Sequence, residues 1–225
     1  MVRKTTVTLG LLGSAVAAVG AWTLYQRATT PEIPATVVAT VGDVELRRYP
    51  PLVTVETEAD SANEAFRRLF GYINGANDGG RDIAMTAPVE RDDVGTSIPM
   101  TAPVAVDDDD TAGPMTASAT ASDAGRTRMA FYLPSDYDVD ATPVPTDAAV
   151  ELVAVPERTL AVVRFSGRPT DDRVARERTR LLDALADAGI ETDGDPFFMG
   201  YDAPWTLPVL RRNEVAVPVR SEPRR

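Results

Sequence analysis

Residues 52–77 read LVTVETEADSANEAFRRLFGYINGAN and contain the clearest secondary-structure pattern in the chain. Val53, Val55 and Thr57 alternate with the more polar residues between and after them, which is the period of a β-strand with one buried face. Ser61 and Glu64 then form a capping-box sequence, which typically opens a helix, and Asn74-Gly75 closes the helix pattern. The stretch therefore predicts a strand followed by a helix. The apolar stripe expected on this helix consists of Ala62, Phe66, Leu69, Phe70 and Ile73.

The same order of elements occurs twice along the chain. Residues 44–133 and 149–219 each show two strands, a helix and then further strands, and the second helix is expected over Asp171–Ala188. We therefore predict an α+β fold, in which two pseudo-repeated halves form a distorted antiparallel β-barrel with two external helices. The apolar stripe of the second helix consists of Val174, Leu181, Leu182 and Leu185. The predicted strands are Val44–Tyr49, Leu52–Glu58, Ile83–Val89, Ile98–Val106, Arg128–Leu133, Val150–Val155, Leu160–Phe165, Phe197–Tyr201 and Glu214–Val219.

Two of the predicted strands, Ile83–Val89 and Ile98–Val106, contain the pentapeptide MTAPV. Proline has no amide hydrogen to donate to a strand ladder, so we expect both segments to be edge strands or bulged strands. Threonine and proline favour an extended path there, and the methionine is expected to pack inside. The predicted role of both pentapeptides is structural.

The chain of 225 residues contains neither cysteine nor histidine. The lack of cysteine excludes disulfides and thiolate metal sites, and the lack of histidine removes the most frequent general base, zinc ligand and haem ligand. The sequence shows no nucleophile beside a base, no set of metal ligands and no phosphate-binding glycine loop. The acidic run Asp107–Asp110 lacks the spaced ligands of a calcium loop. We therefore expect a protein that is not an enzyme and has no metal site of its own.

The formal net charge is −11, and Lys4 is the only lysine. Such an acidic surface, poor in lysine, suits a medium of high salt, where repulsion between like charges is screened. The composition therefore indicates a halophilic source. Nucleic-acid backbones attract basic surfaces, so no nucleic-acid partner is expected.

The N-terminus has the pattern of a membrane segment. Two basic residues precede an uncharged, mostly apolar stretch from Thr5 to Tyr25, long enough to cross a bilayer as a helix. We predict that residues 1–27 form a single-pass anchor in the cell membrane, with the folded domain outside. A secretory signal cleaved near Ala15-Val16-Ala17 and a buried core helix are the alternatives. Residues 28–39, which contain prolines, are expected to be a linker.

Five collinear motifs resemble the SOUL haem-binding family. The resemblance spans nearly all of residues 40–222, the predicted domain, and one motif occurs a second time at Met100–Val104. Each motif alone is weak, whereas five in the same order are specific. The motifs are VELRRYPP (44–51), AFRRLFGYINGAN (65–77), IAMTAPV (83–89), PTDAAVELVAVPERTLAVVRFSG (145–167) and YDAPWTLPVLRRNEVAVPV (201–219).

The resemblance implies a distorted antiparallel barrel and reversible binding of haem, or of a related porphyrin, in a shallow apolar groove beside the first helix. The helix positions that the family places against the porphyrin are Asn63, Phe66, Phe70 and Gly71. The chain departs from family members with a proposed histidine ligand, so binding here must proceed without histidine. The remaining iron ligands would be Tyr72, Tyr201, Met85, Met100 or Met199, unless the protein supplies none.

Several interpretations stay open on sequence alone. Phe66 and Phe70 either fill the core under the helix or border a groove and offer flat aromatic area to a macrocycle. Nearby arginines either pair with propionates or are solvated, and Arg211–Glu214 is expected to form a polar network at the start of the last strand. The alternative function is a protein- or lipid-interaction module that has lost haem binding. The arginines in question are Arg67, Arg68 and Arg81.

Overall fold

The structure is a computed structural model, and it describes residue 25 and residues 29–94, 126–203 and 206–220. Apart from residue 25, the anchor predicted for residues 1–27 lies outside this range, as does the strand predicted for Ile98–Val106. In the part of the chain that the structure describes, no helix is both long enough and apolar enough to span a membrane.

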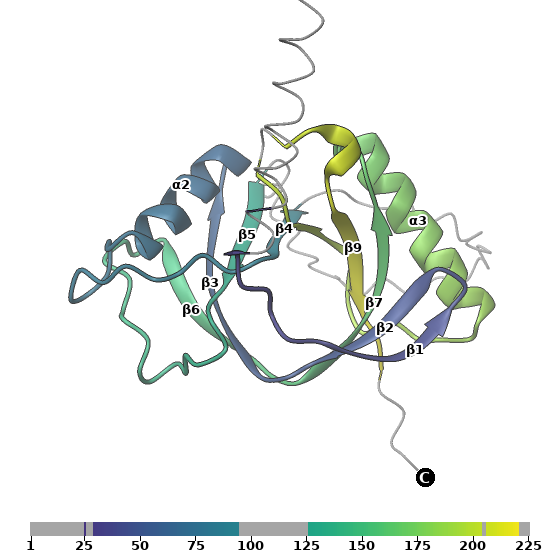
Figure 1. The fold of residues 1–225 in the computed structure, drawn as a ribbon, viewed down its shortest axis with the longest axis horizontal. Coiled ribbons are helices and arrows are strands. Elements are labelled where there is room, and N and C mark those ends of the chain that lie inside the picture. The colour runs from purple at the N-terminus through teal and green to yellow at the C-terminus, as the bar shows by residue number, and fades with distance from the viewer. Residues whose placement is uncertain (1–24, 26–28, 95–125, 204–205, 221–225) are drawn as a thin grey trace, which may run out of the picture.

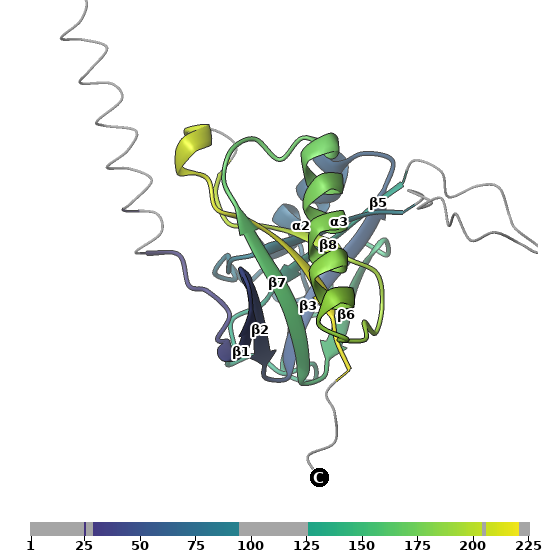
Figure 2. The ribbon, with the colours of Figure 1, turned by 90° about the vertical axis from the view of Figure 1, so that its right-hand side faces the viewer.

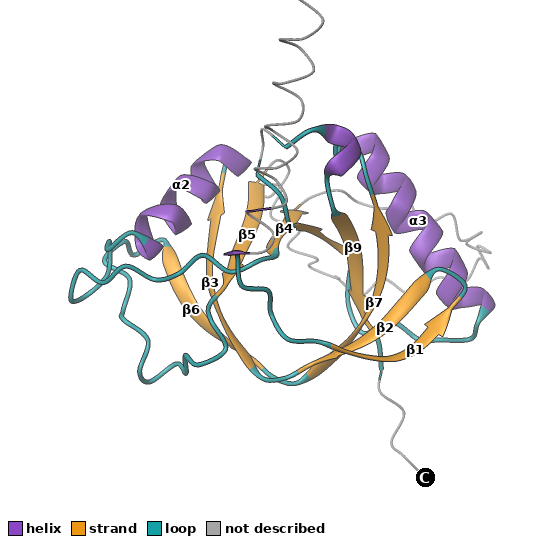
Figure 3. Cartoon of the chain, in the orientation of Figure 1, coloured by secondary structure: helices purple, strands orange, loops and turns teal. Residues whose placement is uncertain are grey.

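In the described part of the chain, nine strands form one antiparallel sheet in the order β1-β2-β7-β9-β8-β4-β5-β3-β6 (Figures 1 and 3). Most of these strands were expected from alternation of apolar and polar residues. Their bounds are β1 Thr36–Val41, β2 Val44–Tyr49, β3 Leu52–Ala59, β4 Val89–Val94, β5 Arg126–Tyr132, β6 Val150–Val155, β7 Arg158–Phe165, β8 Phe197–Gly200 and β9 Asn213–Pro218.

The predicted duplication is confirmed by the strand order. In the first half, β3, β5 and β4 are neighbours; in the second half, β7, β9 and β8 are neighbours in the same arrangement, and the two halves meet where β4 pairs with β8. The strand that precedes each triplet crosses to the other half, because β2 pairs with β7 and β6 pairs with β3. Each half therefore completes the sheet of the other.

The predicted barrel is wrong in one respect, because the sheet formed by the described residues does not close and its edge strands are β1 and β6. Two long strands bend together instead: Tyr49 pairs with Arg158 before the bend and Leu52 pairs with Val155 after it, so the register continues. Prolines occupy the bend on both strands and cannot donate hydrogen bonds there. The sheet curves strongly but keeps two free ends (Figure 1).

One helix covers the outer face of each half. Helix α2, Ala62–Ile73, packs on β3 and β5, and α3, Asp171–Asp187, packs on β7 and β9; Figure 2 shows α3 along the outside of its strands. A short 3-10 helix, η1, spans Pro208–Leu210. A separate apolar cluster lies under each helix, and a third one occupies the inner side of the curved sheet. The third cluster consists of Ile33, Tyr49, Leu52, Tyr132, Leu160, Val162, Phe197, Met199 and Ala216.

The segment around the first MTAPV differs from its prediction. Ile83–Val89 does not form a strand, and β4 begins only at Val89. The backbone of Ala87 bonds elsewhere: its amide donates to the Pro31 carbonyl at 2.9 Å and its carbonyl accepts from the Ile33 amide at 3.0 Å. Proline follows at once, so no continuous ladder can form at these positions.

The segment that was expected to be a linker is ordered within the domain. Its last residues form the edge strand β1, and residues Pro31–Ile33, called the strap below, cross the open side of the curved sheet. Figures 1 and 2 show this segment running on the outside, between the two halves, before it enters β1. Ile33 is buried in the inner cluster. The strap is therefore part of the folded domain.

Candidate functional site

Helix α2 presents an aromatic surface made by Phe66 and Phe70. The two rings stack with their centroids 5.6 Å apart and an interplanar angle of 14°, and the Phe66 ring also meets Phe131 edge-on at 5.4 Å. Phe66 is half-buried, whereas Phe70 is 45% exposed. Phe131 is buried in the cluster beneath. The inner ring is thus fixed by the core, and it holds the outer ring flat against it at the surface.

The other two predicted positions lie on either side of this pair. Asn63 is exposed and lies three residues before Phe66, so it shares the same side of the helix. Gly71 is half-buried, and its carbonyl accepts the amides of Asn74 and Ala76 at 3.2 and 2.9 Å. Asn63, Phe66 and Phe70 form one face, which is called the aromatic face below. Gly71 belongs to the turn that ends the helix.

The predicted apolar stripe of α2 was wrong at Phe70. The helix buries Ala65, Leu69, Tyr72 and Ile73, and Phe70 projects beyond the edge of that stripe. Tyr72 takes the inner position because its hydroxyl finds a partner, the Pro143 carbonyl at 2.8 Å. Burial raises the pKa of Tyr72 to about 12, with Tyr137 and Asp78 adding to the effect. The tyrosine therefore stays neutral and ties α2 to the loop between β5 and β6.

The arginines near the aromatic face have different environments. Arg68 pairs with Glu64 at 2.6 Å and donates to the Glu58 carbonyl at 3.1 Å. Arg67 is exposed and donates only to the Asn63 carbonyl at 3.4 Å, and the side chain of Arg81 is exposed as well. Within the described residues, neither Arg67 nor Arg81 pairs with a carboxylate. These two arginines are free to meet an anion, and Arg68 is not.

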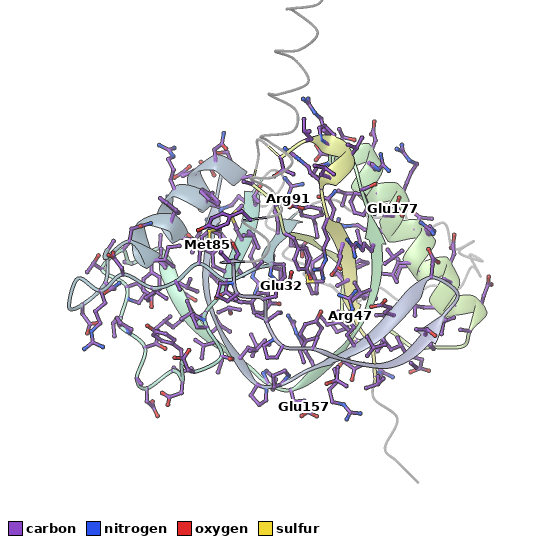
Figure 4. The ribbon with its side chains drawn as sticks, in the orientation of Figure 1. Glu32, Arg47, Met85, Arg91, Glu157 and Glu177 are labelled. Atoms are coloured by element: carbon purple, nitrogen blue, oxygen red, sulfur yellow. The ribbon has the colours of Figure 1, made fainter. Side chains whose placement is uncertain are left out.

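Of the tyrosines and methionines considered as iron ligands, Tyr72 and Met199 are buried and Tyr201 is half-buried. Tyr72 donates to Pro143, Tyr201 donates to Glu214, and Met199 is fully enclosed in the inner cluster. Met100 lies outside the described residues. Met85 is 37% exposed and follows Ile83, which packs in the same cluster as Phe66. Figure 4 places Met85 on the half of the molecule that contains α2. Among the described candidates, Met85 is the one whose side chain is exposed and not buried or half-buried.

Two cavities of about 380 Å³ each lie away from the aromatic face. One lies beside α3, against Leu185, Ile190 and Arg220, and the other is lined by charged residues of β3 and β5 such as Glu58 and Arg128. Neither cavity is lined by the aromatic face or by Gly71. The aromatic face is therefore an exposed surface and not part of either cavity.

The polar network expected near Arg211–Glu214 is present and centres on Glu214. This fully buried carboxylate accepts from Arg47 at 2.8 and 3.2 Å, from Arg212 at 3.1 Å and from the Tyr201 hydroxyl at 2.7 Å. Burial alone would favour the neutral acid, but Arg47, Arg212 and Tyr201 together lower the pKa of Glu214. The network joins β2, β9 and the corner after β8, and it has a structural role in fixing how these elements meet. Figure 4 shows Arg47 near β2 and β9.

A second buried carboxylate, Glu90, was not found from the sequence. It accepts from the Tyr132 hydroxyl at 2.6 Å and from Arg158 at 3.3 Å, and Arg158 also donates to Tyr132 at 2.6 Å. Burial, reinforced by the Glu90 charge, raises the pKa of Tyr132 well above its usual range. The three residues come from β4, β5 and β7, which lie far apart in the chain. No local motif signals such a centre.

Both the sequence and the fold of this chain have counterparts among known proteins. The sequence model of the SOUL heme-binding protein family matches residues 30–218. The chain therefore belongs to the SOUL heme-binding protein family. Heme-binding protein 2 of Mus musculus is 27% identical over 189 residues, which cover 81% of this chain and 80% of the mouse protein.

Two solved structures share the fold at low sequence identity. The C-terminal domain of EcmrR is 13% identical with a TM-score of 0.51, and the match covers 79% of this chain and 97% of that domain. An uncharacterized conserved protein from Listeria innocua is 12% identical with a TM-score of 0.53, covering 81% and 94%. At these identities the similarity concerns the fold alone.

Proposed function

We propose that this chain binds haem or a related tetrapyrrole reversibly on the aromatic face of α2, without histidine and without changing the ligand chemically. The observation that carries the proposal is the stacked pair of Phe66 and Phe70, with the outer ring 45% exposed in a member of a heme-binding family. The predicted groove is replaced in this proposal by a flat platform.

The platform suits a planar apolar guest. An exposed phenylalanine held parallel to a second ring offers one flat side to solvent, and a macrocycle that covers it removes apolar area from water. Phe66 rests edge-on against the buried Phe131, so little side-chain freedom remains to be lost on binding. Pre-ordering of this kind favours rigid, flat ligands over flexible chains.

Two charged side chains fit the acidic groups of a porphyrin. Arg67 lies on the turn of α2 between Asn63 and Phe70, and Arg81 follows the end of the helix. Both are exposed and without a carboxylate partner in the described part of the chain. An arginine can hold a propionate by two parallel hydrogen bonds. We expect these arginines to orient the ligand and the aromatic face to supply most of the affinity.

The haem iron is expected to contribute little to the binding affinity. Histidine is absent from the chain, and Met85 is the exposed residue among the described iron-ligand candidates. A single thioether is a weak contribution compared with the histidine or thiolate that usually holds haem iron. Hemin and iron-free protoporphyrin IX should therefore bind with similar affinity.

A titration of the full chain with hemin and with iron-free protoporphyrin IX, followed in the Soret region at high salt, tests the proposal. Saturable binding of both is expected, and Phe70→Asp should weaken both by tenfold or more, because a charge replaces the outer ring (about 1.4 kcal/mol per tenfold). Val209→Asp is the matched control, since Val209 is 80% exposed on η1. It should leave both affinities unchanged.

Two outcomes would contradict the proposal. If neither porphyrin gives a saturable change, or if Phe70→Asp binds as well as the control, the aromatic face is not the site. A face that captures an apolar peptide or lipid but no porphyrin would favour the interaction-module alternative. Extraction of chemically altered porphyrin after long incubation would show that the chain acts as an enzyme.

A further inference from the structure

Arg212 is oriented by the folded domain from three directions. Its Nε donates to the buried Glu214 at 3.1 Å, its guanidinium lies 3.8 Å from the centre of the Tyr201 ring, and its backbone amide donates to Asp202 at 2.5 Å. These contacts leave Nη1 directed at a fourth group, the Glu32 carboxylate. Nη1 meets the two oxygens of that carboxylate at 3.0 and 2.9 Å.

Glu32 comes from the strap and not from the sheet. Within the residues that the structure describes, two backbone hydrogen bonds hold the strap, both to Ala87, and Ile33 is its one buried side chain in the inner cluster. The Glu32 side chain is 45% exposed, whereas that of Arg212 is 20% exposed. Figure 4 shows Glu32 between the two halves of the molecule. A rigid arginine is thus paired with a carboxylate on a short segment that few contacts hold.

We propose that Arg212 anchors a second ligand site, specific for an apolar carboxylate, which the strap occupies in the closed state. Glu32 takes the position of the ligand's carboxylate, and Ile33 takes the position of its apolar part. When the strap leaves, the guanidinium stays fixed by Glu214 and Tyr201, and the inner cluster around Tyr49, Leu52 and Met199 loses its cover.

The neighbouring arginine explains why Arg212 needs a carboxylate of its own. Glu214 is shared between Arg47 and Arg212, so one carboxylate faces two guanidinium groups. Arg47 has Glu45 as an additional partner at 2.7 Å, two residues away on the same strand. Among the described residues, the additional carboxylate that pairs with the Arg212 side chain is Glu32, on the strap. Displacing the strap therefore opens a place for an anion at Arg212 and not at Arg47.

Dodecanoate, below its micelle concentration, is a suitable probe, measured by isothermal titration of the full chain. Glu32→Ala should bind dodecanoate at least tenfold more tightly than the unmodified chain, because an internal competitor is gone. Glu45→Ala is the matched control, since the two carboxylates are similarly exposed, 43% and 45%. It should bind like the unmodified chain. Dodecanol, which lacks the carboxylate, should bind Glu32→Ala at least tenfold more weakly than dodecanoate.

Hydrogen exchange at the Ile33 and Ala87 amides reports on the strap itself, because these amides donate its two backbone bonds. Both should exchange faster in Glu32→Ala, and faster in the unmodified chain once dodecanoate is added. Equal dodecanoate affinity in Glu32→Ala and Glu45→Ala, equal binding of dodecanol, or unchanged exchange would overturn the proposal. Adding Phe70→Asp to Glu32→Ala should leave dodecanoate binding intact, which keeps this site separate from the aromatic face.

Discussion

Helices α2 and α3 occupy equivalent places in the two halves, but their surfaces differ. Each begins after the first strand of its triplet, β3 or β7, and packs on the outside of that triplet. Helix α3 buries Val174, Leu181 and Leu185, and no large apolar side chain of this helix is exposed. Helix α2 buries its own stripe as well, yet it carries Phe70 on the outside, stacked on Phe66.

This difference separates what the fold requires from what it does not. Because α3 covers its half without exposed aromatic residues, the architecture does not need the aromatic face of α2. A phenylalanine that the fold does not need is a stronger pointer to ligand binding than an apolar residue under a helix. The following predictions test whether the buried residues of the two helices contribute equally to stability, and whether the helices differ in their other properties.

The largest expected effect concerns the packing of each helix over the apolar cluster beneath it. Leu69 in α2 and Leu181 in α3 are both fully buried, each in the cluster under its helix. Leu69→Ala and Leu181→Ala should each lower the free energy of unfolding by about 2–5 kcal/mol, since each leaves a cavity in a packed cluster. Denaturant unfolding measures both.

Exposed positions on the same helices provide the controls for this pair. Arg67→Ala in α2 and Arg176→Ala in α3 remove exposed side chains, and each should change the free energy of unfolding by less than about 0.5 kcal/mol. If one leucine substitution lowers the free energy of unfolding no more than its arginine control does, the two helices do not contribute equally to stability. The comparison between them would then be wrong.

The next effect is a difference between the helices in how their contribution to stability depends on pH. Tyr72 of α2 has its pKa raised by burial to about 12, whereas the buried residues of α3 cannot titrate. An unfolded tyrosine ionises near pH 10, so the stability from Tyr72 is complete below pH 10 and is lost as pH rises towards 12. The loss attributable to this residue should be roughly 2–3 kcal/mol.

Tyr72→Phe isolates this contribution. Near pH 8 the variant should be less stable by about 1 kcal/mol, because the hydrogen bond to the Pro143 carbonyl is gone. The difference should shrink and change sign between pH 10 and 12, because residue 72 ionises on unfolding in the parent chain and cannot in the variant. Leu185→Met in α3 should instead show a constant difference over the same range. A constant difference for Tyr72→Phe would mean that its pKa is not raised.

The sequence predicted the two helices and the duplicated order well, because each depends on local patterns. Helix α2 begins at Ala62, directly after its cap Ser61, and α3 begins at Asp171 as expected. Strand β1 was missed because its side chains are nearly all exposed, so burial imposes no alternation on TVVATV. The open sheet could not be foreseen either, since closure depends on how distant strands pair and not on the pattern within any one of them.

The candidate site was predictable only in part for the same reason. The family motif pointed to Asn63, Phe66 and Phe70 through their spacing on one helix, and the structure places these three on one face. Helical periodicity alone predicted that Phe70 is buried. Apolar residues cover more than one side of this helix, and periodicity cannot tell which of those sides faces the sheet. Partners from separate strands, such as Arg47 with Glu214, carry no local signature and emerge only from the fold.

The smallest predicted effect concerns how each helix starts. Ser61 caps α2 through its side chain, which accepts the Glu64 amide at 3.3 Å, although the Glu64 carboxylate pairs with Arg68 and does not complete a capping box. Thr170 precedes α3 without a side-chain cap bond. Ser61→Ala should therefore cost about 1 kcal/mol in thermal or denaturant unfolding, and Thr170→Ala less than about 0.5 kcal/mol. The reverse order would show that α3 depends on its cap while α2 is held by tertiary contacts alone. The aromatic face would then rest on a helix whose first turn needs no local support.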